Sequence, residues 1–133
     1  MLAQTPKHEL VDRTKLEGWR RLLLNAADWM ETHGFARRKL YNMALGDGVG
    51  PVCARGAIMR ANGRIGNHQL WPWEAGPEIE ADNKLGKFLV RTERLTGFFG
   101  EGGVPYWNND VATGKDEVVA VMRECALEGI DVY

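Results

Sequence analysis

The chain has 133 residues, of which 44% are hydrophobic and 26% charged, so it is long enough for one globular domain with a buried core. Its formal net charge of −1 gives no indication of nucleic-acid or membrane binding, and no apolar run approaches the roughly 20 residues that cross a bilayer. Charged residues interrupt the N-terminus, which therefore lacks the apolar core of a secretion signal, and we expect a cytoplasmic protein.

The first half of the chain predicts an arm and two helices. Polar residues 1–14 predict an N-terminal arm ahead of a single helical domain over residues 15–133. Apolar side chains at spacings of three and four predict an amphipathic helix over residues 15–32, and Gly34 marks its C-terminal end. The stretch 52–61 predicts a second, shorter helix, whose small residues indicate close approach to a neighbouring helix.

Pro77 opens a predicted third helix. Glu78, Glu80 and Asp82 crowd its first turns and basic residues follow later, an order that complements the helix dipole. The spacing of three and four then predicts an inner face made of Leu85, Phe88, Leu89, Thr92 and Leu95.

A turn over residues 108–110 precedes the predicted last helix, which runs from Lys115 to Glu128. Thr113 is the predicted N-cap, and Asp116 is placed to return a hydrogen bond, as in a capping box. Apolar residues form the inner face, whereas Glu117, Arg123, Glu124 and Glu128 are expected to face away. Since strand signals are weak, we expect a mainly α protein, a small bundle of about four helices with long loops that contain Gly and Trp.

Two stretches of sequence carry a family resemblance. The first is Cys53-Ala54-Arg55-Gly56-Ala57-Ile58, followed by Ala61. The second is Trp107-Asn108-Asn109-Asp110, followed by Thr113, Glu117-Val118 and Ala126. Over residues 16–128 the chain resembles a family of small uncharacterised proteins from actinobacteria and their phages, in which the second block reads Trp-Asn-Asp. The resemblance brings no activity, but it implies a soluble, mostly helical protein and favours a phage or mobile-element origin.

The cysteines offer one candidate for chemistry. Cys53 begins the predicted helix over residues 52–61, and a helix N-terminus lowers a thiol pKa, which makes Cys53 a candidate nucleophile. The alternative is that Cys53 and Cys125 are reduced, buried, structural thiols. The histidines that could act as a base are far apart along the chain, so we expect no metal site and no cofactor.

Three segments are candidates for binding. Trp71 and Trp73 flank a proline in a loop, where they are either core anchors or an interface patch. Arg37-Arg38-Lys39 is a basic cluster that could contact a phosphate backbone or be solvated surface. Asn109 and Asp110 either complete a turn or hold a ligand.

Residues 1–65 hold 11 basic and 6 acidic side chains, and residues 66–133 hold 6 and 12, which predicts either a dipolar surface or two halves that neutralise each other on packing. We predict a non-enzymatic protein, phage-borne and directed at a host macromolecule, with a protein as its partner. The alternatives are an enzyme that uses Cys53 or the Asn109–Asp110 turn, and a nucleic-acid contact through Arg37–Lys39.

Overall fold

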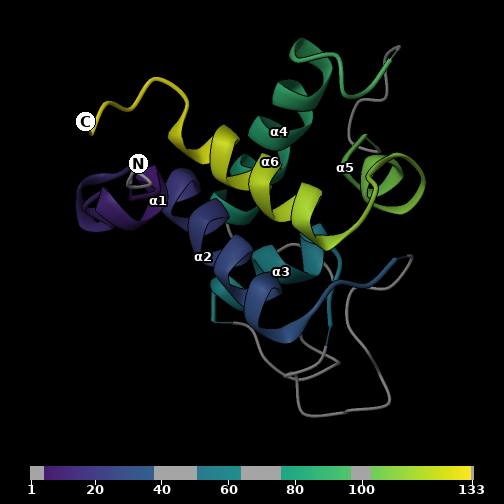
Figure 1. The fold of residues 1–133 in the computed structure, drawn as a ribbon, viewed down its shortest axis with the longest axis horizontal. Coiled ribbons are helices and arrows are strands. Elements are labelled where there is room, and N and C mark those ends of the chain that lie inside the picture. The colour runs from purple at the N-terminus through teal and green to yellow at the C-terminus, as the bar shows by residue number, and fades with distance from the viewer. Residues whose placement is uncertain (1–4, 38–50, 64–75, 97–102, 133) are drawn as a thin grey trace, which may run out of the picture.

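The computed structural model describes residues 5–37, 51–63, 76–96 and 103–132. Within these ranges the chain forms six α-helices and no strand, which confirms the mainly α fold (Figure 1). The predicted helices correspond to α2, α3, α4 and α6. The α-helices are α1 (Lys7–Leu10), α2 (Gly18–His33), α3 (Ala54–Ala61), α4 (Gly76–Arg91), α5 (Gly103–Tyr106) and α6 (Lys115–Leu127), joined by a 3-10 turn η1 (Arg13–Lys15) and a π-helical turn η4 (Trp107–Val111).

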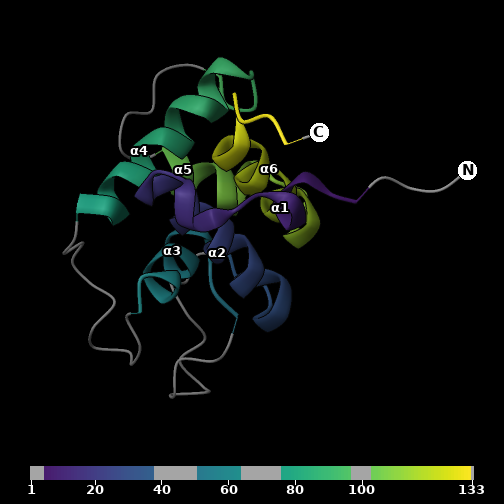
Figure 2. The same ribbon diagram turned by 90° about the vertical axis from the view of Figure 1, so that its left-hand side faces the viewer.

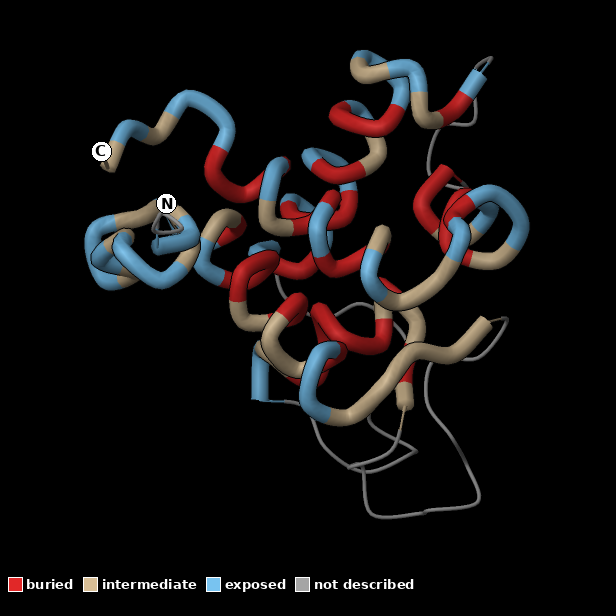
Figure 3. Tube along the Cα trace, in the orientation of Figure 1, coloured by how far each residue is buried: buried red, intermediate tan, exposed pale blue. Residues whose placement is uncertain are grey.

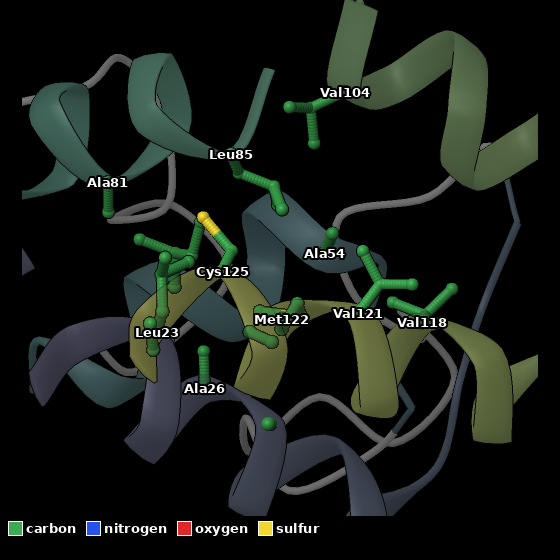
Figure 4. Packing of buried hydrophobic residues seen from close by; sticks show 14 of the residues in the cluster. Leu23, Ala26, Ala54, Ala81, Leu85, Val104, Val118, Val121, Met122 and Cys125 are labelled. Carbon is green, nitrogen blue, oxygen red and sulfur yellow. The ribbon is translucent and has the colours of Figure 1, made fainter. Parts of the chain in front are cut away.

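Helix α2 is the centre of the fold, because it packs against α3, α4 and α6. Its buried apolar face follows the predicted stripe and includes Leu23 and Ala26, which lie beside Met122 of α6 (Figure 4). Helices α3 and α4 add their own buried side chains to the same cluster. The buried positions therefore lie on the inward faces of the main helices, as the red segments of Figure 3 show.

The end of α2 is fixed by Gly34, as predicted. Its φ of +104° lies in the region that favours glycine, and a Cβ there would come within 3.2 Å of Cγ of Pro51. Directly after it, the Ala36 N–H donates to the carbonyl of Val52 at 2.9 Å, within a parallel bridge between Phe35 and Val52. This bridge places the start of α3 beside the end of α2.

The prediction that Thr113 caps α6 is wrong. The helix begins after Gly114, which is the N-cap residue and makes no side-chain hydrogen bond. Instead, the carboxylate of Glu117 accepts the backbone N–H of Thr113 at 2.5 Å. Glu117 stands at the third helical position, where a capping-box carboxylate acts, so Glu117 does what Asp116 was expected to do. At the other end, Gly129 follows the helix with a φ of +81°.

Arg123 was expected to face away from the core, and this too is wrong. Its guanidinium lies between α6 and α2, where it donates to Asp28 at 2.9 Å and to Glu31 at 3.1 Å. In the opposite direction, Arg20 of α2 donates to the carbonyls of Ala126 and Glu128 at the C-terminal end of α6. Charged side chains thus bind α2 to α6 around the rim of an apolar contact.

Helix α4 ends earlier than the predicted inner face. It stops at Arg91, and Glu93 follows with a φ of +63°. Thr92 is half-buried and Leu95 is buried in the turn that follows the helix. None of the described helices is long and apolar enough to cross a membrane.

Candidate functional site

The segment η4 is the most unusual backbone of the described fold. Its residues Trp107–Val111 form a single π-helical turn, which closes with the Ala112 N–H donating to the Trp107 carbonyl at 2.8 Å. The sequence predicted a turn here, but not its π geometry. Single π-helical turns are rare and are frequently found at functional sites.

Asn108 fixes this turn from beneath. The residue is 1% exposed, and its Oδ1 accepts the N–H of Ala54, the first residue of α3, at 3.0 Å. Its Nδ2 donates to the carbonyl of Ala36 at 3.2 Å and to Oδ1 of Asn109 at 2.9 Å. One buried amide therefore joins η4, the end of α2 and the start of α3.

Arg37 fixes the same turn from the side. Its guanidinium donates to the backbone carbonyls of Asn108, Asn109 and Ala112 at 2.8–3.0 Å, and it lies 5.2 Å from the ring centre of Phe35. Carbonyls at the C-terminal end of a helix lack the donors of a following turn, and Arg37 donates to three carbonyls at this end of η4. The guanidinium of the half-buried Arg37 is thus engaged with backbone carbonyls of the fold.

Above these two anchors, η4 and the residue before it present side chains to solvent. Tyr106 is 44% exposed and Val111 is 41% exposed, so both are among the exposed large hydrophobic residues of the described chain. Asp110 between them is exposed and Asn109 is half-buried. We call the surface formed by Tyr106, Asp110 and Val111 the turn face.

Cys53 is the residue before α3, as expected, but its environment opposes nucleophilic chemistry. Its Sγ accepts the N–H of Gly56 at 3.5 Å, and burial raises the pKa of the thiol. Burial likewise raises the pKa of Cys125 to about 12. Both cysteines are free, Cys125 buried and Cys53 partly so. In the part of the chain that the structure describes, no group of His, Cys, Asp and Glu could hold a metal ion.

A second polar cluster lies between α3 and α4 and was not predicted. Nε and one terminal nitrogen of Arg55 donate to the two carboxylate oxygens of Asp82 at 2.9 and 3.0 Å, and Asn62 donates to Glu78 at 2.8 Å. Glu78 and Asp82 are 0% and 5% exposed, and Arg60 is 3% exposed. The sequence held a signal for this cluster, because positions 78 and 82 are in register with the buried positions 85 and 89 of the same helix.

Several predicted site residues lie outside the described residues. These are Trp71 and Trp73 of the tryptophan loop and Arg38 and Lys39 of the basic cluster. The structure brings together three of the others, because Arg37 and Asn109 meet at η4 and Asp110 belongs to the same turn.

The comparisons with known proteins give a family whose function is unknown. A family model described as a family of unknown function (DUF6197) matches residues 17–128, and the chain therefore belongs to this family. The matched segment agrees with the resemblance drawn from the two sequence stretches. Neither a curated protein nor a solved structure matches the chain.

Proposed function

We propose that this member of a family of unknown function is a non-enzymatic binding protein, and that it holds a protein partner on the turn face. The observation that carries the proposal is the combination of an exposed aromatic side chain, Tyr106, and an exposed aliphatic one, Val111. Both lie on or beside a turn that is held by buried and partly buried hydrogen bonds. Tyrosine is enriched among the residues that dominate the energy of protein interfaces.

The rigidity of the turn supports this use. Binding loses free energy when it has to order loops, and a surface that is already ordered loses less. Asn108 and Arg37 together make six hydrogen bonds that hold η4, three from each side chain. The turn face can therefore meet a partner without first being ordered.

The two alternative functions have weaker support. An enzyme that uses Cys53 would need a thiolate, and burial shifts the pKa of that thiol in the opposite direction. A nucleic-acid contact through Arg37–Lys39 would need the guanidinium of Arg37, which is engaged with backbone carbonyls. An exposed apolar pair such as Tyr106 and Val111 favours a protein surface instead.

The proposal also includes the compartment and the origin of the protein. Free thiols at both cysteines are typical of a reducing compartment, and we therefore propose that the protein works in the cytoplasm. The family resemblance favours a phage origin, and for a phage-borne protein the partner would be a host macromolecule. The loop with Trp71 and Trp73 is proposed as a further part of the binding surface, on the sequence argument alone.

The experiment measures partner capture with matched surface variants. Tagged wild-type protein and Tyr106→Ala, Val111→Ser and Val90→Ser variants are incubated with a host lysate, and the captured partner is identified and titrated. Val90 is 43% exposed on α4, so it controls for the loss of any exposed apolar side chain. We expect Tyr106→Ala to weaken binding by about 2 kcal/mol, roughly 30-fold, while Val90→Ser binds as wild type.

Thermal melts of the same variants separate binding from folding. Because Tyr106 and Val111 are exposed, their substitution should leave the melts close to those of wild type. Undiminished capture by both turn-face variants would refute the turn face as the binding surface. Trp71→Ala and Trp73→Ala variants in the same assay test the loop, since an interface anchor loses binding and a core anchor loses about 3–5 kcal/mol of stability.

A further inference from the structure

The segment before α2 packs on the helical body with little apolar burial. Residues 5–16, which we call the strap, contain α1 and η1, and none of these residues is buried (Figure 3). Leu10 is 48% exposed, whereas Val11 and Leu16 are partly buried against the core. The strap runs beside the C-terminal end of α6 (Figures 1 and 2).

Polar contacts attach the strap. Arg13 donates to Oδ2 of Asp28 at 2.6 Å and to Oδ1 of Asn25 at 2.7 Å, both on α2. Lys7 donates to the carbonyl of Leu127 at the longer distance of 3.4 Å. The side chains of Arg13 and Asp28 are 25% and 43% exposed, so water competes for the main attachment. We call the Arg13–Asp28 pair the latch.

Asp28 accepts hydrogen bonds from two arginines. While Oδ2 accepts from Arg13 of the strap, Oδ1 accepts from Arg123 of α6 at 2.9 Å. Arg123 has a second carboxylate partner in Glu31, whereas the latch is the one ion pair that the described residues give Arg13. Removing the Asp28 charge therefore removes the ion pair of Arg13, and removing the Glu31 charge does not.

The strap forms a wall of a groove of about 660 Å³. Lys7 and His8 line it from the strap, and Phe88, Ala120 and Leu127 line it from α4 and α6. Phe88 and Leu127 are 4% and 6% exposed, so the groove adjoins the edge of the apolar core. The family match begins at residue 17, so the strap lies outside the matched segment and those three residues lie inside it.

We propose that the strap is a detachable wall of this groove, held by the latch, and that it opens while helices α2 to α6 stay folded. Segments with few buried apolar contacts and solvent-exposed polar attachments open locally at a free-energy cost far below that of global unfolding. Opening removes Lys7 and His8 from the groove and uncovers apolar surface at Phe88 and Leu127. The fold thus contains a groove with one wall that is either docked or detached.

Limited trypsin digestion tests the proposal, because the strap contains Lys7, Arg13 and Lys15. Cleavage after Lys15 is the informative event, since this bond lies beyond the latch. We expect wild type to be cut there at a rate that low urea concentrations leave unchanged, as for local opening. In Asp28→Asn we expect about fivefold faster cleavage, the upper range for a half-exposed ion pair.

Glu31→Gln is the matched control, because it also removes a carboxylate partner of Arg123 but leaves the latch intact. It should be cut within about twofold of the wild-type rate. A dye that fluoresces on apolar surfaces should brighten with Asp28→Asn and not with Glu31→Gln. Equal cleavage of both variants, or cleavage that follows global unfolding in urea, would overturn the latch. An unchanged dye signal in a variant that is cut faster would overturn the strap as a wall of the groove.

Discussion

Two helix pairs of this fold place their charges in opposite positions. Between α2 and α6 the contact is apolar, and the ion pairs of Arg123 with Asp28 and Glu31 lie at its rim. Between α3 and α4 the carboxylate lies inside, since the Asp82 side chain is 6% exposed and that of Asp28 is 43% exposed. The side chains of Arg55 and Arg123 are exposed to a similar extent, 15% and 14%. The same ion pairing therefore has different consequences, because a rim charge that loses its partner is solvated by water and a buried one is not.

The buried pair should show the largest effect. We expect Asp82→Asn to lower the free energy of unfolding by about 3–5 kcal/mol, because it removes the buried carboxylate charge that accepts two hydrogen bonds from Arg55. Urea denaturation measures this loss. The double variant Arg55→Met, Asp82→Leu removes both charges and should recover most of the stability. If the free energy of unfolding of Asp82→Asn lies within about 1 kcal/mol of the wild-type value, the Arg55–Asp82 pair has the small energy of a solvent-exposed ion pair.

The uncharged anchor at η4 should rank next. Asn108→Ala leaves the buried N–H of Ala54 without its acceptor, and we expect a loss of about 1–3 kcal/mol of unfolding free energy. Asn83→Ala is the control, since Asn83 is exposed on α4 and should change stability by less than about 0.5 kcal/mol. Equal losses of unfolding free energy in Asn108→Ala and Asn83→Ala would show that burial does not determine how much an asparagine stabilises this fold.

The rim pair at α2 should matter less and should depend on pH. Burial alone would raise the pKa of Asp28, but hydrogen bonds from Arg13 and Arg123 outweigh it and hold the pKa below its usual value. Its contribution to stability is therefore present at neutral pH and lost as the pH falls through the pKa of the folded state. Asp28→Asn should lose less than about 1 kcal/mol at pH 7.

Urea melts of wild type and Asp28→Asn at neutral and acidic pH measure this dependence. The stability difference between them should shrink toward zero when Asp28 is protonated. A difference that stays constant over the whole range would show that the pair acts through packing and not through charge.

The smallest effect in this series is expected for Thr113→Ala, beside the start of α6. Since Thr113 is exposed and does not cap the helix, Thr113→Ala should change the free energy of unfolding by less than about 0.5 kcal/mol. Glu117→Ala should cost about 1 kcal/mol, because its carboxylate accepts the Thr113 N–H. Chemical denaturation of the two variants distinguishes them, and a larger loss for Thr113→Ala would restore the hydroxyl as the cap.

The main helices could be predicted because their signals are local. Apolar spacing locates α2 and α6, and Gly34 and Gly129 end them through backbone angles that only glycine adopts easily. The start of α6 was mispredicted because Thr113 and Gly114 are both acceptable N-caps, and only the backbone path decides between them. Arg123 was assigned to solvent because its partners belong to a helix far away along the chain.

The candidate site could be predicted in part. The sequence singled out Asn109 and Asp110 and expected a turn, but it gave Asn108 no anchoring role, because the acceptors and donors of Asn108 lie in other segments. The buried cluster between α3 and α4 was missed for a different reason. The acidic residues at the start of α4 were interpreted as favourable charges for the helix dipole, and burial was therefore not considered. The register of Glu78 and Asp82 with Leu85 nevertheless indicated burial.

The hydrogen bonds of Arg37 also bear on how the chain folds in time. They join residues 71 to 75 positions apart in the sequence, so they form only after a long loop has closed. Helices form through local contacts in microseconds, before long-range contacts can offset the entropy lost on closing such loops. Loss of the Arg37 side chain should therefore speed unfolding and leave the folding rate nearly unchanged. The arginine therefore prolongs the lifetime of the native turn after the chain has reached it.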